Sequence, residues 1–138
     1  MSDKFPPVMQ RPRLLALAST LEISITQLRR DDCGDWAIIG NSGRVYAVLS
    51  GFQIVIAGWE ADRAPWSTAK GWNLCKSKLS FAKLMQDGHD EGAFVLERDP
   101  RGDEAAIIRE CVGLRKRRAI SEDGLAALRS RLAAFRAA

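Results

Sequence analysis

The stretch DWAIIGNSGRVYAVLSGFQIVIAGW, residues 35–59, decides the fold of this chain. It holds three apolar runs rich in β-branched and aromatic residues, and the turn-forming residues Asn41-Ser42-Gly43 and Ser50-Gly51 separate them. Runs of this composition between such turns are typical of antiparallel strands joined by tight connections. The stretch therefore predicts a three-stranded antiparallel meander.

Apolar residues recur at every second position within these runs, which predicts one face of each strand turned toward a core. The residues expected on that face are Trp36, Ile38, Val45, Ala47, Leu49, Phe52, Ile54 and Ile56. The residues expected on or near the other face are Arg44, Tyr46, Ser50 and Gln53.

Two further apolar runs, residues 81–85 and 93–96, flank the loop QDGHDEG and predict a second hairpin with its turn at residues 87–92. Helical spacing after Asp103 predicts a helix over residues 104–112 that Asp103 caps and Gly113 ends, and a final helix over about residues 121–136. The expected fold class is α+β: an antiparallel sheet of about five strands, flanked by an N-terminal helical hairpin and C-terminal helices.

Length and composition fit one domain over residues 1–138, since 138 residues with 46% hydrophobic content can bury a real core. Within it we expect an extended arm (1–12), because of its prolines, a helix-turn-helix-like region (13–32), a sheet region (35–98) and a basic helical region (103–138). The longest apolar runs fall short of the roughly 18 residues of a membrane helix, and no signal-peptide stretch opens the chain. A cytoplasmic location is expected.

The segment RLLALASTLEISITQLRRDD predicts two short helices, residues 13–21 and residues 24–30, with Ser24 as N-cap of the second. Residues 17–30 resemble the central part of a bacterial helix-turn-helix, whose usual pattern is L-A-x-x-L-G-V-S-x-x-T-V-S-R. The resemblance implies that the second helix enters a major groove, with Thr26 and Gln27 near base edges and Arg29 and Arg30 on the same helix.

Two departures from this pattern favour a different interpretation. Glu22 replaces the turn glycine, which normally takes a positive φ, and Asp31 and Asp32 would repel a phosphate backbone. The alternative is a structural helical hairpin packed on the sheet.

Charge is distributed unevenly along the chain. Residues 1–100 contain equal numbers of acidic and basic side chains, so the net charge of +4 comes entirely from residues 101–138. Arg115, Lys116, Arg117 and Arg118 form the densest basic run, and such a run either anchors on phosphates or is a solvated linker that pairs with acidic residues elsewhere.

Other chemistry has weak support in the sequence. There is no P-loop and no G-x-S-x-G motif, the three cysteines form no C-x-x-C pair, and His89 is the single histidine. We therefore expect no enzyme, no cofactor and no metal site. The tryptophans at 59, 66 and 72, interleaved with lysines, favour core packing over a base-stacking platform.

The leading hypothesis is a small non-enzymatic nucleic-acid-binding protein, such as a regulator from a mobile element. Residues 78–118, with SFAKLMQDGHDEG and IIRECVGLRKR, resemble small uncharacterised proteins of alphaproteobacterial genomes and their prophages, a resemblance that implies no activity. The alternative is a protein–protein interaction module, in which the final Leu/Arg helix and the acidic loop form homodimer or partner contacts without nucleic acid. The predicted nucleic-acid-binding residues are Thr26, Gln27, Arg29, Arg30, Arg115, Lys116, Arg117 and Arg118.

Overall fold

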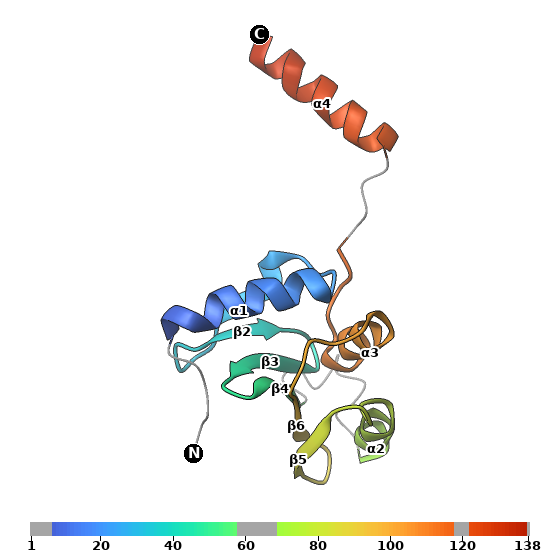
Figure 1. Ribbon diagram of the computed structural model, residues 1–138. Helices are drawn as coiled ribbons and strands as arrows, with labels where there is room; N and C mark the ends of the chain where they lie inside the picture. Colours follow the sequence, from blue (N-terminus) through green and yellow to red (C-terminus); the bar gives the residue numbers. More distant parts are fainter. Residues whose placement is uncertain (1–6, 58–68, 118–121, 138) are drawn as a thin grey trace.

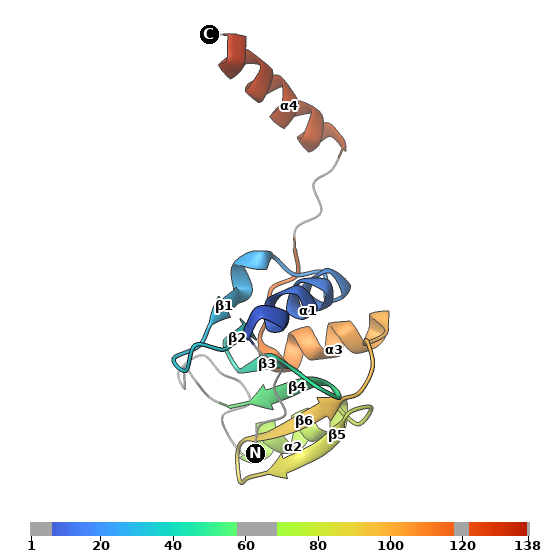
Figure 2. The same cartoon turned by 60° about the vertical axis from the view of Figure 1, so that its left-hand side comes forward.

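The computed structural model describes residues 7–57, 69–117 and 122–137. In this part of the chain, six antiparallel strands form one sheet with the order β1-β2-β3-β4-β6-β5 (Figures 1 and 2). The α+β class is confirmed. The helices are α1 (Pro7–Thr20), α2 (Ala69–Lys78), α3 (Gly102–Val112) and α4 (Glu122–Ala137), with one short 3-10 helix, η1 (Ile25–Gln27). The strands are β1 (Leu28–Arg30), β2 (Trp36–Ile39), β3 (Gly43–Val48), β4 (Gly51–Ile56), β5 (Lys83–Asp87) and β6 (Gly92–Leu96).

The meander expected from residues 35–59 is confirmed as β2, β3 and β4. Ile38 pairs with Val45, and Val45 pairs with Ile54, so alternate residues of all three strands share one face. These three side chains are almost completely buried. Leu49 is an exception to the predicted pattern, because it lies in the turn between β3 and β4 and is 64% exposed.

The predicted second hairpin is confirmed as β5 and β6, and β6 joins it to the meander by pairing with β4. Phe94 of β6 pairs with Ile54, which places Phe94 on the core face of the sheet. Trp72 of α2 packs on Phe94 with the ring centroids 5.5 Å apart. One hydrophobic core therefore lies between this face and three helices, with Leu17 of α1, Trp72 of α2 and Ile108 of α3 among its members.

The predicted helix over residues 24–30 is wrong. A single turn of 3-10 helix follows Ser24, and residues 28–30 form the edge strand β1, in which Leu28 pairs with Ile38 and Arg30 with Trp36. An isolated helix of seven residues gains little stability in water, whereas β2 offers an open row of hydrogen-bonding groups and a site in the core for Leu28. Glu22 does adopt the positive φ of the turn glycine, at +56°.

The predicted extended arm is also wrong for residues 7–12, which form the first turns of α1. Proline suits the first position of a helix because its missing N–H has no partner there, so Pro7 begins the helix and only Pro12 interrupts its hydrogen bonds. Gln10 fixes this end of α1 to the sheet: its side-chain amide donates to Asp35 and accepts from the Trp36 N–H, each at 3.0 Å. Residues 1–6 of the expected arm lie outside the described part.

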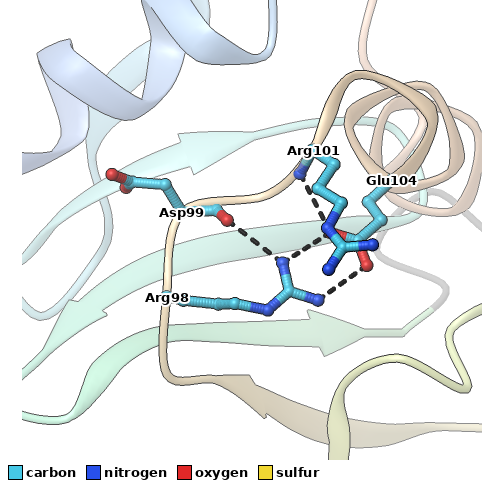
Figure 3. Close-up of polar contacts among 4 residues, drawn as sticks. All are labelled: Arg98, Asp99, Arg101 and Glu104. Atoms are coloured by element: carbon cyan, nitrogen blue, oxygen red, sulfur yellow. Dashed lines mark hydrogen bonds and ion pairs between the residues drawn. The ribbon is translucent and has the colours of Figure 1, made fainter.

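α3 starts earlier than expected, at Gly102 instead of Glu104, so Asp103 lies inside the first turn and does not cap the helix; the Glu104 carboxylate holds this turn (Figure 3). Glu104 accepts two hydrogen bonds from Arg98, at 2.6 and 2.7 Å, and a third from the Arg101 backbone N–H at 2.9 Å. Arg98 and this N–H together lower the pKa of Glu104 to about 2. At the other end, Gly113 ends the helix as predicted, in the left-handed conformation with φ +77°.

The last helix, α4, stands apart from the sheet and from the other three helices in both views (Figures 1 and 2). Its bounds agree with the predicted final helix, and the core of the described residues includes none of its side chains. None of the described helices is long and apolar enough to cross a lipid bilayer.

Candidate nucleic-acid interface

The chain after α3 forms a strap, residues 113–117, that lies between the turn after α1 and the turn after β2. The Gly113 carbonyl accepts from the Asn41 N–H at 3.2 Å, and the Arg117 N–H donates to the Glu22 carbonyl at 2.6 Å. Ile23 and Lys116 form an isolated antiparallel bridge. These contacts place the predicted basic run beside the segment that carries Thr26 to Arg30.

Gly40 makes this close approach possible. A Cβ at this position would collide with the carbonyl oxygen of Val112, at the end of α3. A residue without a side chain is therefore required where the end of β2 passes the start of the strap.

Gln27 fastens the strap to the sheet edge through its side chain. Its Nε2 donates to the Arg115 carbonyl and its Oε1 accepts from the Arg115 N–H, both at 3.1 Å, so the amide replaces the backbone of a neighbouring strand. The residue is only 8% exposed. The Gln27 amide, which was predicted to read base edges, is thus bonded to the strap within the protein.

Arg29 and Arg44 project from the sheet face opposite the core and flank Ile39. Register requires this, since Arg29 pairs with Ala37 and Arg44 with Ile39, both of which alternate with the core residue Ile38. A hollow of about 340 Å³ lies between them. Its lining residues are Arg29, Arg30, Asp31, Asp32, Ile39, Gly40, Asn41 and Arg44.

A second hollow, of about 440 Å³, adjoins the first and reaches the strap. Its lining residues are Thr26, Gln27, Arg29, Ile39, Gly40, Asn41, Gly113 and Arg115. The two hollows share Arg29 and the turn after β2, so they lie side by side around the end of β2, and together we call them the groove. We call the five cations on and beside this groove the cationic face: Arg29, Arg44, Arg115, Lys116 and Arg117.

Arg30 occupies the edge of the sheet next to Trp36. Its guanidinium lies 5.1 Å from the centre of the Trp36 ring, and the guanidinium of Arg11 lies 5.5 Å from the same ring. A cation held over an aromatic ring is attracted by the negative face of the ring. This contact holds the exposed Arg30 side chain over Trp36, on the face of the sheet opposite Arg29 and Arg44.

Two carboxylates near the cationic face already have partners within the protein. Asp31 accepts from the N–H groups of Cys33 and Asp35, both at 2.9 Å, and from the Tyr46 hydroxyl at 3.0 Å, so it braces the loop between β1 and β2. Burial is the main reason that the pKa of Tyr46 is raised. Glu22 lies 3.4 Å from the Lys116 ammonium and thereby reduces the positive charge of the strap.

The structure brings most of the predicted nucleic-acid-binding residues together. Thr26, Arg29 and Arg115 are exposed around the groove, and Lys116 and Arg117 are exposed on the strap. Arg30 is exposed too, but it lies over Trp36 on the opposite face of the sheet. Arg118 lies outside the described residues. Sequence reasoning missed Arg44, because alternation placed it away from the core but could not show that β3 brings it close to Arg29.

Other candidate sites have structural roles. Asp87 of the acidic loop accepts from Trp72 Nε1 at 2.9 Å and from Lys76 at 3.0 Å, and Lys76 is the main reason that its pKa is lowered. Trp72 is fully buried, which excludes it from base stacking, and Trp59 and Trp66 lie outside the described residues. Within the described ranges, no group of three or more His, Cys, Asp or Glu side chains is placed to hold a metal ion.

The cysteines fall into two environments. Cys33 is exposed, whereas Cys75 of α2 and Cys111 of α3 are buried free thiols. The contact with Cys111, together with burial, raises the pKa of the Cys75 thiol. The Cys75 thiol therefore stays protonated and is not activated as a nucleophile.

Comparison of the chain with models of protein families, with curated protein sequences and with solved structures found no match.

Proposed function

We propose that this protein is a small, non-enzymatic nucleic-acid-binding protein that holds a phosphate backbone in the groove around the end of β2. One observation carries the proposal: Arg29, Arg44 and Arg115, which are far apart in the sequence, converge on that groove. Planar guanidinium groups bind phosphate through paired hydrogen bonds, and they keep their charge at any physiological pH.

The geometry favours contact with the backbone over reading of bases. Residues 28–30 form a strand at the edge of the sheet, so this segment offers no helix to a major groove. Phosphate contacts set position and affinity but carry little sequence information. The proposed protein therefore binds with little sequence preference. The resemblance of residues 78–118 to proteins of alphaproteobacterial genomes and their prophages favours a regulator from a mobile element as the setting.

A titration at two salt concentrations tests this proposal. Fluorescently labelled duplex DNA, single-stranded DNA and RNA of arbitrary sequence are titrated with the full chain at about 50 and about 200 mM salt. Each phosphate contact steepens the slope of log affinity against log salt by about 0.9 on duplex and about 0.7 on single strands. We expect a slope of about −2 to −3, because the side chains of Arg29, Arg44 and Arg115 converge on the groove.

Matched variants show whether the groove is responsible. Arg29→Ala and Arg115→Ala should each weaken binding and reduce the salt slope by about one contact. Lys83→Ala removes the same charge from the exposed strand β5, at the opposite edge of the sheet, and should change neither quantity. Absence of binding at the lower salt concentration, or equal losses for Lys83→Ala and Arg29→Ala, would contradict the proposal.

A second candidate function, the protein–protein interaction module, has a separate observation in its favour. Exposed large apolar side chains occur on two elements away from the cationic face: Leu84 and Met85 on the edge strand β5, and a stripe along α4. Exposed apolar surface of this kind is typical of contact sites. Self-association in high salt without any affinity for nucleic acid would favour this candidate.

A further inference from the structure

Cations lie on both faces of the sheet at its edge strand β1. Arg29 and Arg30 are consecutive residues of this strand, so their side chains leave it on opposite faces. Arg29 lines the groove, whereas Arg30 pairs with Trp36 on the face that carries the core. Both side chains are exposed. The positive charge at this edge is therefore not confined to the cationic face.

A second cation accompanies Arg30 on the core side of the sheet. Arg11 of α1 is exposed, and its guanidinium lies over the same Trp36 ring, with centroid distances of 5.5 Å for Arg11 and 5.1 Å for Arg30. None of the described carboxylates forms an ion pair with either arginine. We call Arg11 and Arg30 the Trp36 pair. Their charges remain available to an anion from outside the protein.

We propose that the ligand is a single-stranded nucleic acid that passes over the edge of β1, from the groove on one face to the Trp36 pair on the other. This inference rests on the function proposed above. An unpaired strand is flexible, so its successive phosphates can contact Arg29 on one face and Arg30 on the other. Its bases are free to stack on guanidinium planes, which the Trp36 pair offers at a fixed place.

A duplex cannot make both sets of contacts. A single α-helix is about 10 to 12 Å across and already fills a major groove about 12 Å wide. Here α1 lies beside β1, so this edge of the protein is thicker than one helix and enters neither groove (Figure 2). Bending the duplex around the edge is also unfavourable, since DNA is stiff over about 150 base pairs. A duplex held in the groove therefore does not reach the Trp36 pair.

The loop after β1 limits where the strand can cross. Asp31 and Asp35 accept hydrogen bonds within the protein, and Asp32 is exposed. An exposed carboxylate repels a phosphate backbone. We therefore place the crossing over Arg29 and Arg30 and not over the loop.

Fluorescence anisotropy on the full chain at about 50 and about 200 mM salt tests the crossing. The probes are labelled single strands of DNA and of RNA, each of about 12 nucleotides, a length within the range that single-strand-binding domains cover, and the DNA duplex of the same sequence. The natural chain should bind a single strand more tightly than the duplex. The tighter of the two single strands identifies the ligand, and the variants are measured on that strand and on the duplex.

Arg30→Ala should weaken single-strand binding at least about threefold at the lower salt and reduce the salt slope by about 0.7, the value for one phosphate contact. Its duplex affinity should stay within about twofold of the natural chain, and Arg11→Ala should behave in the same way. Arg29→Ala, in the groove, should weaken binding to both probes. Lys83→Ala, at the opposite edge of the sheet, is the matched control and should change neither. Urea unfolding of each variant verifies that the fold is intact.

The outcomes separate this inference from the proposed function. Weaker binding in Arg29→Ala, with unchanged single-strand binding in Arg30→Ala and Arg11→Ala, would overturn the crossing and leave the groove as the binding site. Equal losses on duplex and single strand in Arg30→Ala, or tighter binding of the duplex by the natural chain, would also overturn it. Absence of binding to all three probes would contradict the proposed function itself, and the crossing with it.

Discussion

Two buried glutamines connect parts of the chain that are distant in sequence. Gln10 joins the start of α1 to the start of β2, and Gln27 joins the sheet edge to the strap. In each case the side-chain amide forms hydrogen bonds with polar groups that lie next to the core. The described backbone hydrogen bonds do not pair these groups. Buried polar groups of this kind stabilise a protein chiefly because leaving them unpaired is unfavourable.

Gln27→Ala should therefore destabilise the protein. The substitution leaves the N–H and carbonyl of Arg115 without their partner, at a cost of about 1 to 3 kcal/mol in the free energy of unfolding. Urea denaturation measures the loss. Thr26→Ala, at the exposed neighbour, should change stability by no more than about 0.5 kcal/mol. Equal effects of the two substitutions would show that the amide does not hold the strap.

Glu22 opposes the proposed function of the strap, because its carboxylate lies near Lys116 and Arg109. Glu22→Gln should strengthen binding to DNA by a few-fold and steepen its salt dependence, since one negative charge leaves the cationic face. Glu97→Gln, at an exposed position after β6, removes the same charge elsewhere and is the control. Unchanged affinity in Glu22→Gln would argue against the strap as a phosphate contact.

At the scale of elements, the start of α3 depends on one carboxylate. Glu104 is largely buried. Its carboxylate accepts hydrogen bonds from both terminal nitrogens of Arg98 and from the backbone N–H of Arg101 at the start of the helix. These bonds lower its pKa from the ordinary 4.5 to about 2. The folded state thus favours the ionised carboxylate, and this contribution to stability is complete above pH 4.5.

The stability that Glu104 supplies should disappear as the pH falls from about 4.5 to about 2, because the unfolded chain takes up the proton first. Glu104→Gln should be less stable than the natural chain at pH 7, and the difference should shrink through this window. Urea denaturation at pH 7, 4 and 2.5 provides the comparison. Asp103→Asn, in the same turn but outside the Arg98 pair, should not reproduce the effect; a constant difference at every pH would refute this account.

At the scale of the whole molecule, the sheet domain and α4 are separate in their packing. Every residue of the core cluster precedes Arg115. A chain that ends after Arg117 should therefore unfold in urea with a free energy within about 0.5 kcal/mol of the full chain, measured at a concentration where both are monomeric. A loss above about 2 kcal/mol would show that α4 supports the domain.

The sequence by itself determined the meander, the second hairpin and the bounds of α4, because each depends on periodicity within a short window. Apolar residues recur at every second position in the meander, as at Val45 and Ala47 and at Ile54 and Ile56, and the Leu stripe of α4 has helical spacing. Such patterns show which face of a helix or strand is apolar, but they do not show which other element covers that face.

Only the tertiary structure decided the rest. Residues 24–30 carry a helix-like pattern, yet the open edge of β2 and the core site for Leu28 draw residues 28–30 into the sheet. The groove also depends on tertiary structure. Arg29 and Arg115 line the same hollow because Gly113 turns the chain and Gly40 lets it pass close to the end of β2. Hydrogen bonds and close approaches between distant segments leave no local period, so the pattern of either segment alone cannot reveal them.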